Sequence, residues 1–206
     1  MRDGNRTRRA LEVKIQNGAM EEPTRIAAVV LAAGASKRFG SPKQLARIGG
    51  RTVLECVIEV ARAAGLAPII AVVPPGIAVP PDVVPVVNAD PAAGLSRSLG
   101  MGIAAVPPDL GAAVILLGDQ PTLPVETVRA VVGAARSDRP VVAARADNRL
   151  GPPVLVLRDA FGLAQDASGD EGLRSILTDH SDLVTPVDVG THAPDVDTPA
   201  DLERLS

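Results

Sequence analysis

Three cationic side chains fall within a short span directly after a run of small residues. Lys37, Arg38 and Lys43 follow the segment Leu31-Ala32-Ala33-Gly34. Small residues let backbone N–H groups approach a phosphate closely, and nearby ammonium and guanidinium groups supply the positive charge that holds it. The apolar residues 26–31 before the loop indicate a buried strand, and a strand that leads into such a loop is a common way to hold a nucleotide. The sequence therefore predicts a site for a nucleoside triphosphate.

The spacing excludes two well-known phosphate-binding loops. A Walker loop needs a glycine, four residues, and then Gly-Lys followed by Ser or Thr, and the chain has no such string. A dinucleotide-binding loop needs Gly-x-Gly-x-x-Gly after a strand, whereas this loop has only Gly34 and Gly40. The loop therefore belongs to another class of nucleotide site, or it is a basic surface loop between a strand and a helix.

The pattern that the loop does match is L-A-A-G-x-S-x-R-x-G-x-x-K, which runs from Leu31 to Lys43. It resembles the motif of the nucleotidyltransferases similar to molybdenum cofactor cytidylyl- and guanylyltransferases. The resemblance implies that Arg38 and the loop backbone hold the β- and γ-phosphates, and that Lys43 lies near the α-phosphate. Arg38 and Lys43 are then catalytic residues. The nucleotide-binding residues implied for this loop are Leu31, Ala32, Ala33, Gly34, Ser36, Arg38 and Lys43.

Two acidic segments match further motifs of the same family. Asp119 ends an apolar strand within the string G-D-Q-P, and Asp197 lies in the segment 195–201, which resembles D-x-D-T-P-x-D. The resemblance implies that Asp119 and Asp197 hold Mg²⁺, for which Mn²⁺ can substitute, with Asp195 as an alternative ligand. Asp119 is then also a catalytic, nucleotide-binding residue, since a carboxylate at a strand end commonly binds the magnesium that bridges phosphates. Both segments have a structural interpretation as well, because Asp is common in turns and at helix starts.

A polar segment farther along the chain is a candidate for contacts to the base and ribose. Asn88 and the string G-L-S-R-S-L at 94–99 resemble the family's N…G-x-S-x-S-L segment. The resemblance implies that Asn88, Gly94, Ser96 and Ser98 bind the nucleotide. An Asn side chain offers a donor and an acceptor to a base edge, and serine hydroxyls at a helix start can meet phosphate or ribose. Ordinary helix capping explains the same residues equally well.

A second substrate is expected beside the nucleotide. The string G-D-E-G-L-R at 169–174 resembles a G-D-x-G-x-R segment of the cytidylyl branch, and it makes Gln120, Asp170 and Arg174 the candidate contacts to the acceptor. The structural alternative is that Asp170 caps a helix and Arg174 lies on its solvated face. The chain departs from the pattern of the cytidylyl branch at one position that concerns the same substrate. Pro152 stands where that branch often has a histidine, and proline neither titrates nor donates a hydrogen bond.

The elements that must position these residues alternate along the chain. Apolar runs predict strands at 26–31, 67–73, 83–87, 112–117, 140–144, 154–157 and 183–187, and helical patterns occur at 52–64, 94–106, 124–135, 159–165, 171–177 and 197–202. This alternation predicts a three-layer α/β/α, Rossmann-like fold of the nucleotidyltransferase type with a mostly parallel sheet. The loops after 31, 87 and 117 then meet at the carboxyl edge, where such sheets bind ligands. We expect residues 25–206 to form one nucleotidyltransferase domain. Residues 1–24 are expected to be a disordered tail, or an over-extended start with Met20 as the true initiator.

Composition excludes several other classes of protein. The chain of 206 residues is 46% hydrophobic and 22% charged with a net charge of −3, so it lacks the basic footprint of a nucleic-acid-binding protein. One cysteine excludes a disulfide framework and a cysteine zinc site. No segment reaches the length of a membrane span, and the Arg8-Arg9 pair is not followed by the apolar region of an export signal. We therefore expect a cytoplasmic protein without nucleic-acid or membrane partners.

The reaction that the resemblance implies is the Mg²⁺-dependent transfer of CMP from CTP to the phosphate of molybdopterin in the molybdenum cofactor, with release of pyrophosphate. Ala33 favours CTP, because the guanylyl branch typically has L-A-G-G at this place. A molybdenum hydroxylase would then receive the product through a transient contact. Within the class, GTP as donor and a sugar phosphate or phospholactate as acceptor remain alternatives. From another class, a non-catalytic chaperone that binds the cofactor and delivers it to a hydroxylase is the rival.

Overall fold

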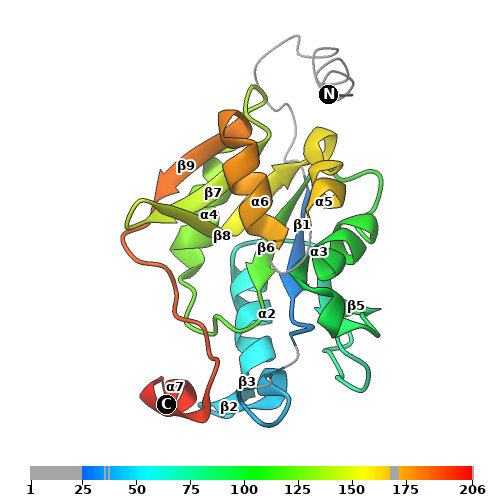
Figure 1. Cartoon of the computed structure of the whole chain (residues 1–206), viewed down its shortest axis with the longest axis vertical. Coiled ribbons are helices and arrows are strands. Elements are labelled where there is room, and N and C mark those ends of the chain that lie inside the picture. The colour runs from blue at the N-terminus through cyan, green and yellow to red at the C-terminus, as the bar shows by residue number, and fades with distance from the viewer. Residues whose placement is uncertain (1–24, 35, 37, 168–171, 206) are drawn as a thin grey trace.

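Seven strands form one sheet in the computed structural model, which describes residues 25–34, 36, 38–167 and 172–205. The expected tail, Lys37 and Asp170 lie outside these residues. The order across the sheet is β5-β4-β1-β6-β8-β7-β9 (Figure 1), and of these seven described strands only β8 is antiparallel to its neighbours. The mostly parallel sheet is therefore confirmed. The strands are β1 Ile26–Leu31, β4 Ile69–Val73, β5 Val83–Val87, β6 Ala112–Leu117, β7 Val141–Ala146, β8 Arg149–Leu157 and β9 Val184–Asp188.

Helices cover both faces of the sheet, as the apolar runs of its strands require. Side chains alternate along β1, so Val29 packs on one face with α3, α5 and α6, and Val30 packs on the other with α2 and α4. This gives the predicted three layers (Figure 1). The α-helices are α2 Val53–Ala63, α3 Leu95–Ala104, α4 Val125–Gly133, α5 Leu163–Asp166, α6 Gly172–Asp179 and α7 Pro199–Arg204, and the 3-10 helices are η1 Lys43–Leu45, η2 Pro91–Ala93, η3 Arg158–Ala160 and η4 Ser181–Leu183.

Two glycines permit close approaches that bring elements to the carboxyl edge. A Cβ on Gly102 would lie 2.4 Å from Cγ1 of Val29, so this glycine lets α3 pack directly on β1. A Cβ on Gly118 would lie 2.5 Å from Cβ of Ala32, and the Gly118 N–H donates to the carbonyl of Leu31 at 2.9 Å. The chain that leaves β6 is thereby held against the chain that leaves β1. Asp119, the next residue, is fixed beside the loop after β1.

The structure differs from the predicted elements in three places. A small hairpin of β2 (Arg47–Ile48) and β3 (Arg51–Thr52) turns through Gly49 and Gly50, which both have positive φ. The strand expected at 154–157 begins at Arg149, because β7 and β8 form a hairpin through residues 147 and 148. The helix expected at 159–165 is divided into η3 and α5. Because β8 is antiparallel, its earlier start extends the sheet at the carboxyl edge, where Arg149 pairs with Ala146 at the end of β7. The ends of β1, β5 and β6, whose loops carry the predicted site residues, lie where the sequence predicts them.

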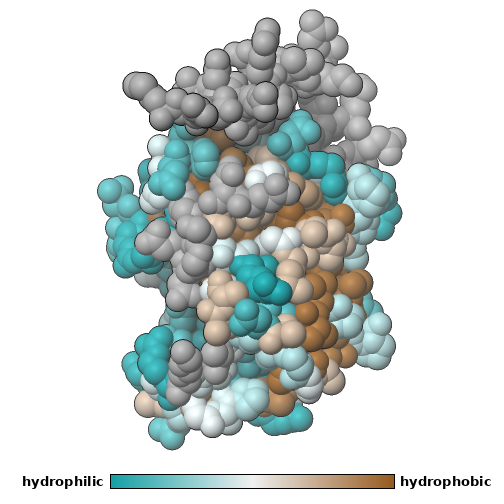
Figure 2. Space-filling view, turned by 45° about the vertical axis from the view of Figure 1, so that its right-hand side comes forward, coloured by the Kyte–Doolittle hydropathy of each residue, from teal (hydrophilic) through white to brown (hydrophobic). Residues whose placement is uncertain are grey.

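The β5 edge of the sheet exposes two large hydrophobic side chains. Val84 and Val87 are 45% and 52% exposed, and hydrophobic surface is visible in Figure 2, which brings the β5 side forward. Pro85 lacks the N–H that an added strand would need, so this edge is poorly suited to strand pairing. In the part of the chain that is described, no helix has the length and apolar character to cross a membrane.

Candidate active site

Lys43 is the centre of a cluster of charges at the carboxyl edge. Its ammonium nitrogen lies 2.6 Å from Oδ2 of Asp119, which follows β6, and 3.0 Å from Oδ1 of Asp197, which precedes α7. Arg38 Nη2 donates to Oδ2 of the same Asp197 at 2.7 Å. The structure thus brings together all four of the residues that carry the predicted catalytic and metal-binding roles. Three distant parts of the sequence meet here.

The Lys43 ammonium is well shielded from water, whereas Arg38 is not. The Lys43 side chain is 11% exposed and that of Arg38 is 73% exposed. Burial acts to lower the pKa of Lys43, but the carboxylates of Asp119 and Asp197 outweigh it, and the pKa is raised. Lys43 therefore stays a cation at neutral pH. It donates to two carboxylates, and an ammonium has three N–H donors, so one donor remains for a phosphate.

The segment before α7 is fixed to β6 by its backbone and to its own helix by a cap. Val196, which is fully buried, donates its N–H to the carbonyl of Asp119 at 2.8 Å. Thr198 and Asp201 form a capping box at the start of α7, and the Asp201 carboxylate also accepts from the Asp197 N–H at 3.1 Å. These hydrogen bonds lower the pKa of Asp201. The helix-start interpretation of this string is therefore right for Thr198 and Asp201, while Asp197 is left to face Lys43.

Gln120 and Asp195 are joined by a hydrogen bond next to this cluster. Gln120 is 5% exposed and donates through Nε2 to Asp195 Oδ1 at 2.9 Å and to the carbonyl of Ala193 at 3.3 Å. Partial desolvation of the Asp195 carboxyl, followed by the nearby charge of Asp119, raises its pKa. In this arrangement Gln120 holds the C-terminal segment and offers little surface to a second substrate. Asp195 does not contact Lys43, so Asp197 is the better placed of the two candidate ligands.

A cleft of about 420 Å³ opens beside Lys43. The cleft is lined by the loop after β1, by η2, by the start of α3 and by the segment before α7. The lining residues are Ala33, Gly34, Ser36, Arg38, Lys43, Pro91, Ala92, Gly94, Leu95, Ser98 and Asp197. Leu31 and Ala32 are buried below the loop, and Ser96 is half-buried outside the lining set. The cleft therefore lies between the loop after β1 and the start of α3.

Asn88 anchors the far wall of this cleft instead of lining it. The residue has no exposed surface, its Nδ2 donates to Ser98 Oγ at 3.0 Å, and its Oδ1 accepts from the Asp90 N–H at 3.0 Å. Both functional ends of the amide are therefore used within the protein. Asn88 thus links the end of β5 to Ser98 of α3, and Gly94 and Ser98 are the residues of this segment that line the cleft.

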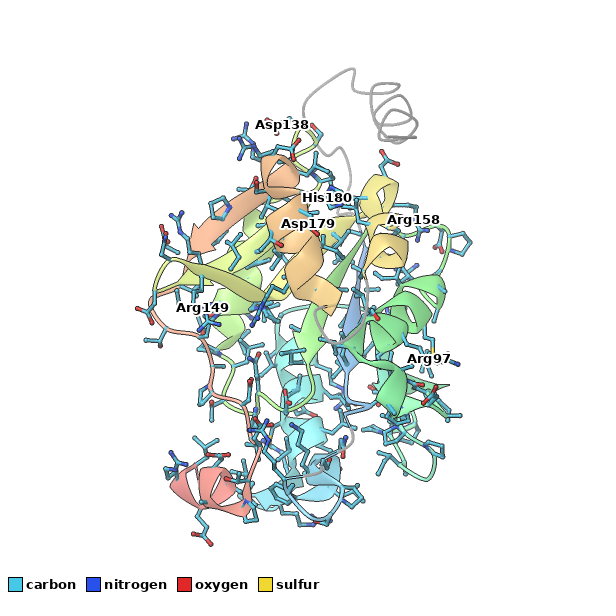
Figure 3. All side chains as sticks on the ribbon, viewed as in Figure 1. Arg97, Asp138, Arg149, Arg158, Asp179 and His180 are labelled. Carbon is cyan, nitrogen blue, oxygen red and sulfur yellow. The ribbon has the colours of Figure 1, made fainter. Side chains whose placement is uncertain are left out.

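Three other side chains lie outside this cluster. Arg174 is exposed on α6 and does not line the cleft. His180 lies at the end of α6, well away from α7 (Figure 3), and His192 contacts the carbonyl of Arg149 through Nε2 at 3.0 Å. A Cβ on Gly151 would lie 3.3 Å from Cε1 of His192, so this imidazole packs against the residue before Pro152.

The carboxylates at Lys43 suit a hard cation that nucleotide phosphates also bind. Oδ1 of Asp119 is buried and has no hydrogen-bond partner among the described residues, which is costly for a carboxylate unless a further cation satisfies it. The described residues contain no group of three or more His, Cys, Asp or Glu side chains able to hold a metal ion. Magnesium commonly uses only one or two carboxylates and completes its shell with phosphates and water. Asp119 and Asp197 fit that mode of binding.

Sequence reasoning missed Gln44, the residue after Lys43. Its side chain is 2% exposed and donates to the carbonyls of Ala32 and Gly34 at 2.6 and 3.1 Å. No periodicity marks such a residue, because it lies in the short 3-10 helix η1. Its position directly after a predicted catalytic lysine was the one available signal.

Comparison with known proteins places this chain among nucleotidyltransferase-like folds. The sequence profile described as "MobA-like NTP transferase domain" matches residues 28–184. The crystal structure of Rv0371c from Mycobacterium tuberculosis H37Rv is 32% identical with a TM-score of 0.77, and the match covers 88% of this chain and 97% of that one. A manganese complex of Rv0371c is 31% identical with a TM-score of 0.73, covering 88% and 98%.

A curated relative matches over a shorter stretch. The bifunctional protein GlmU of Leifsonia xyli subsp. xyli (strain CTCB07) is 36% identical over 124 residues. The match covers 54% of this chain and 25% of that protein, so the chain corresponds to about a quarter of its length.

Proposed function

The chain belongs to the family of MobA-like NTP transferase domains, and we propose that it transfers CMP from CTP to the phosphate of molybdopterin in the molybdenum cofactor. As a nucleotidyltransferase of this family, it acts on a nucleoside triphosphate. The identities of the donor and the acceptor are the proposal. The observation that carries the nucleotidyl transfer itself is the contact of Lys43 with both Asp119 and Asp197 at the edge of the cleft.

In the proposed reaction, a phosphate oxygen of the acceptor attacks the α-phosphorus of the nucleotide in line. The new P–O bond forms as the bond from the α-phosphorus to the bridging oxygen breaks, and that electron pair leaves with pyrophosphate. An acceptor phosphate is already largely ionised at neutral pH, because its second pKa is about 6. No general base is then needed, and alignment and charge neutralisation supply the catalysis.

Each residue of the cluster has a role that its surroundings support. Lys43 would use its remaining N–H donor on the α-phosphate, where charge shifts in the transition state. Arg38, which is exposed at the mouth of the cleft, would bind the β- and γ-phosphates together with the backbone of Ala33, Gly34 and Ser36. Magnesium or manganese, when bound by Asp119 and Asp197, supplies further neutralisation of the phosphates.

CTP as donor and the molybdenum cofactor as acceptor are supported by the motifs of the sequence. Ala33 lines the cleft in the L-A-A-G form that resembles the cytidylyl branch. The base would lie toward the η2 region, where the chain offers backbone groups and aliphatic walls, since its only aromatic residues are two phenylalanines. The proline at position 152 is the observation that favours another acceptor, such as a sugar phosphate or phospholactate.

Pyrophosphate release measured over a panel of donors and acceptors tests this proposal. CTP and GTP are each combined with molybdenum cofactor, a sugar phosphate or phospholactate, with and without Mg²⁺. We expect release with CTP and molybdenum cofactor only when Mg²⁺ is present. Release with GTP but not with CTP would overturn the choice of donor. Release with a sugar phosphate or phospholactate but not with molybdenum cofactor would overturn the choice of acceptor. Tight binding of the cofactor without pyrophosphate release from any donor would favour the chaperone.

A further inference from the structure

Gln44 is a buried amide directly behind the predicted phosphate loop. It is among the largest fully buried side chains of the protein, and it lies in η1 next to Lys43. Its Nε2 reaches the carbonyls of Ala32 and Gly34 at 2.6 and 3.1 Å, and its Oε1 accepts from Ser36 Oγ at 3.4 Å. One side chain thus contacts three positions of the loop that follows β1.

We propose that Gln44 is a positioning residue that holds this loop in the conformation that binds the nucleotide's phosphates. The inference rests on the proposed function, because it assigns Gln44 a role in binding the same nucleoside triphosphate. Gln44 itself does not line the cleft beside Lys43, so it acts through the loop.

The hydrogen bonds of Gln44 decide which backbone groups the loop presents. Carbonyl oxygens carry partial negative charge and repel a phosphate, whereas N–H groups attract it. Gln44 draws the carbonyls of Ala32 and Gly34 toward itself. In a planar trans peptide the N–H points opposite to the carbonyl, so the Ala33 N–H is directed away from Gln44. Ala33 is one of the residues that line the cleft.

Gln44 also connects the loop to the catalytic lysine. The Lys43 backbone N–H donates to Ser36 Oγ at 3.2 Å, and that hydroxyl contacts the Gln44 side chain. Ser36 has a φ of +51°, a backbone conformation that non-glycine residues rarely adopt without support. The contacts of Gln44 and Lys43 provide that support. The position of the Lys43 main chain and the shape of the loop are therefore set by the same hydrogen bonds.

The amide of Gln44 serves the fold and the loop conformation through the same hydrogen bonds. Burying an amide is costly unless it is hydrogen-bonded, and an apolar side chain of similar size would fill the same space. The advantage of the amide is that it satisfies two loop carbonyls that would otherwise be free to turn toward the cleft. A variant at Gln44 should therefore weaken nucleotide binding in addition to lowering stability, and the two effects are separated by a control variant of reduced stability.

Calorimetric binding of CTP with Mg²⁺ to wild type and Gln44→Met tests the inference. Methionine keeps the length and the apolar volume but cannot donate to the carbonyls. Thr52→Ala, which removes the cap of α2, is the control for lost stability, because Thr52 neither bonds to the loop carbonyls nor lines the cleft. All measurements are made well below the melting temperature of each variant. Loss of two hydrogen bonds should weaken binding by about tenfold or more in Gln44→Met, while Thr52→Ala binds as wild type does.

Unchanged affinity in Gln44→Met would overturn the inference, as would an equal loss in Thr52→Ala. If Gln44→Met does not fold, Gln44→Asn decides, because asparagine is one methylene shorter and reaches at most one of the two carbonyls. We expect it to weaken binding, and wild-type affinity in Gln44→Asn would overturn the inference. If the wild type binds GTP in place of CTP, the same comparison is made with GTP. A wild type that binds neither nucleotide would overturn the proposed function and this inference together, whereas tight wild-type binding with unaltered variants overturns this inference alone.

Discussion

Lys43 and Asp119, 76 residues apart in the sequence, form an ion pair of 2.6 Å whose side chains are only 11% and 23% exposed. The same ammonium reaches Asp197 at 3.0 Å. The group expected to bind phosphate thus lies between the groups expected to bind the metal ion. Partial burial strengthens these contacts relative to an exposed ion pair, so the arrangement is held in place before any substrate arrives.

Removing the Lys43 charge should abolish most of the activity. In Lys43→Met the α-phosphate loses its neutralising donor, and we expect pyrophosphate release to fall by roughly 10²- to 10³-fold. Asp119 and Asp197 also lose their common partner, so thermal unfolding is recorded in parallel. Activity within a few-fold of wild type would show that Lys43 is only a structural cation.

Metal ion and nucleotide should bind cooperatively. Without nucleotide, a divalent cation at Oδ1 of Asp119, to which no described residue donates, is repelled by the nearby Lys43 ammonium and must compete with it for Asp197. A bound triphosphate gives that ammonium another partner. We expect the complex of protein and CTP to bind Mn²⁺ at least about tenfold more tightly than the free protein does. The Mn²⁺ that CTP binds in solution is subtracted in this comparison. Electron paramagnetic resonance of free Mn²⁺ measures both affinities. Equal affinities would mean that the lysine does not compete.

Arg38→Ala should affect substrate binding more than stability. Arg38 is 73% exposed, so its ion pair with Asp197 contributes no more than about 1 kcal/mol to the free energy of unfolding. A guanidinium that binds the β- and γ-phosphates contributes more, and we expect the KM for the nucleotide to rise roughly tenfold. Steady-state kinetics and urea unfolding are compared on the same preparations. A shift in stability without a shift in KM would contradict the assigned role.

The start of α2 makes a prediction about pH that is separate from the site. Hydrogen bonds from the backbone and side chain of Thr52 hold the pKa of Glu55 below its ordinary value. A depressed pKa stabilises the fold above the unfolded-state value of about 4.3, and this stabilisation is lost as the pH falls through the folded-state pKa. Wild type should therefore be more stable than Glu55→Gln at neutral pH, and the difference should shrink in acid.

The Thr52→Ala variant tests the same cap by a second measurement. Its free energy of unfolding should be lower by about 1 kcal/mol at neutral pH. A pH-independent difference between wild type and Glu55→Gln, or a Thr52→Ala variant as stable as wild type, would show that the capping box contributes little.

The strand ends could be predicted from the sequence because the central strands are continuous apolar runs. In β1 and β6 every residue but the terminal Ile26 and Leu117 is buried, so these segments had to be interior strands with loops at a common edge. Because β1 and β6 are parallel neighbours, the loop after residue 31 and Asp119 lie side by side at the same edge of the sheet. The β2–β3 hairpin and the start of β8 were missed because short polar strands carry no apolar run.

The partners within the site could be predicted only in part. The motifs indicated Lys43, Asp119 and Asp197, but the choice between Asp195 and Asp197 depends on the hydrogen bonds of Val196 and Gln120, which join segments far apart in the chain. Asn88 was expected at a base edge, whereas both ends of its amide are bound within the protein. A single sequence does not show whether a polar group is turned toward a ligand or toward its own backbone.

The most direct test of the account is the release of pyrophosphate from CTP with molybdenum cofactor and Mg²⁺ by wild type, Asp119→Asn and Asp82→Asn. Asp82 forms an exposed ion pair with Arg62, so its variant removes the same charge outside the site. We predict at least about a hundredfold loss in Asp119→Asn and near wild-type release in Asp82→Asn. Asp119→Asn activity equal to that of the control would contradict the assignment of this cluster as the catalytic centre.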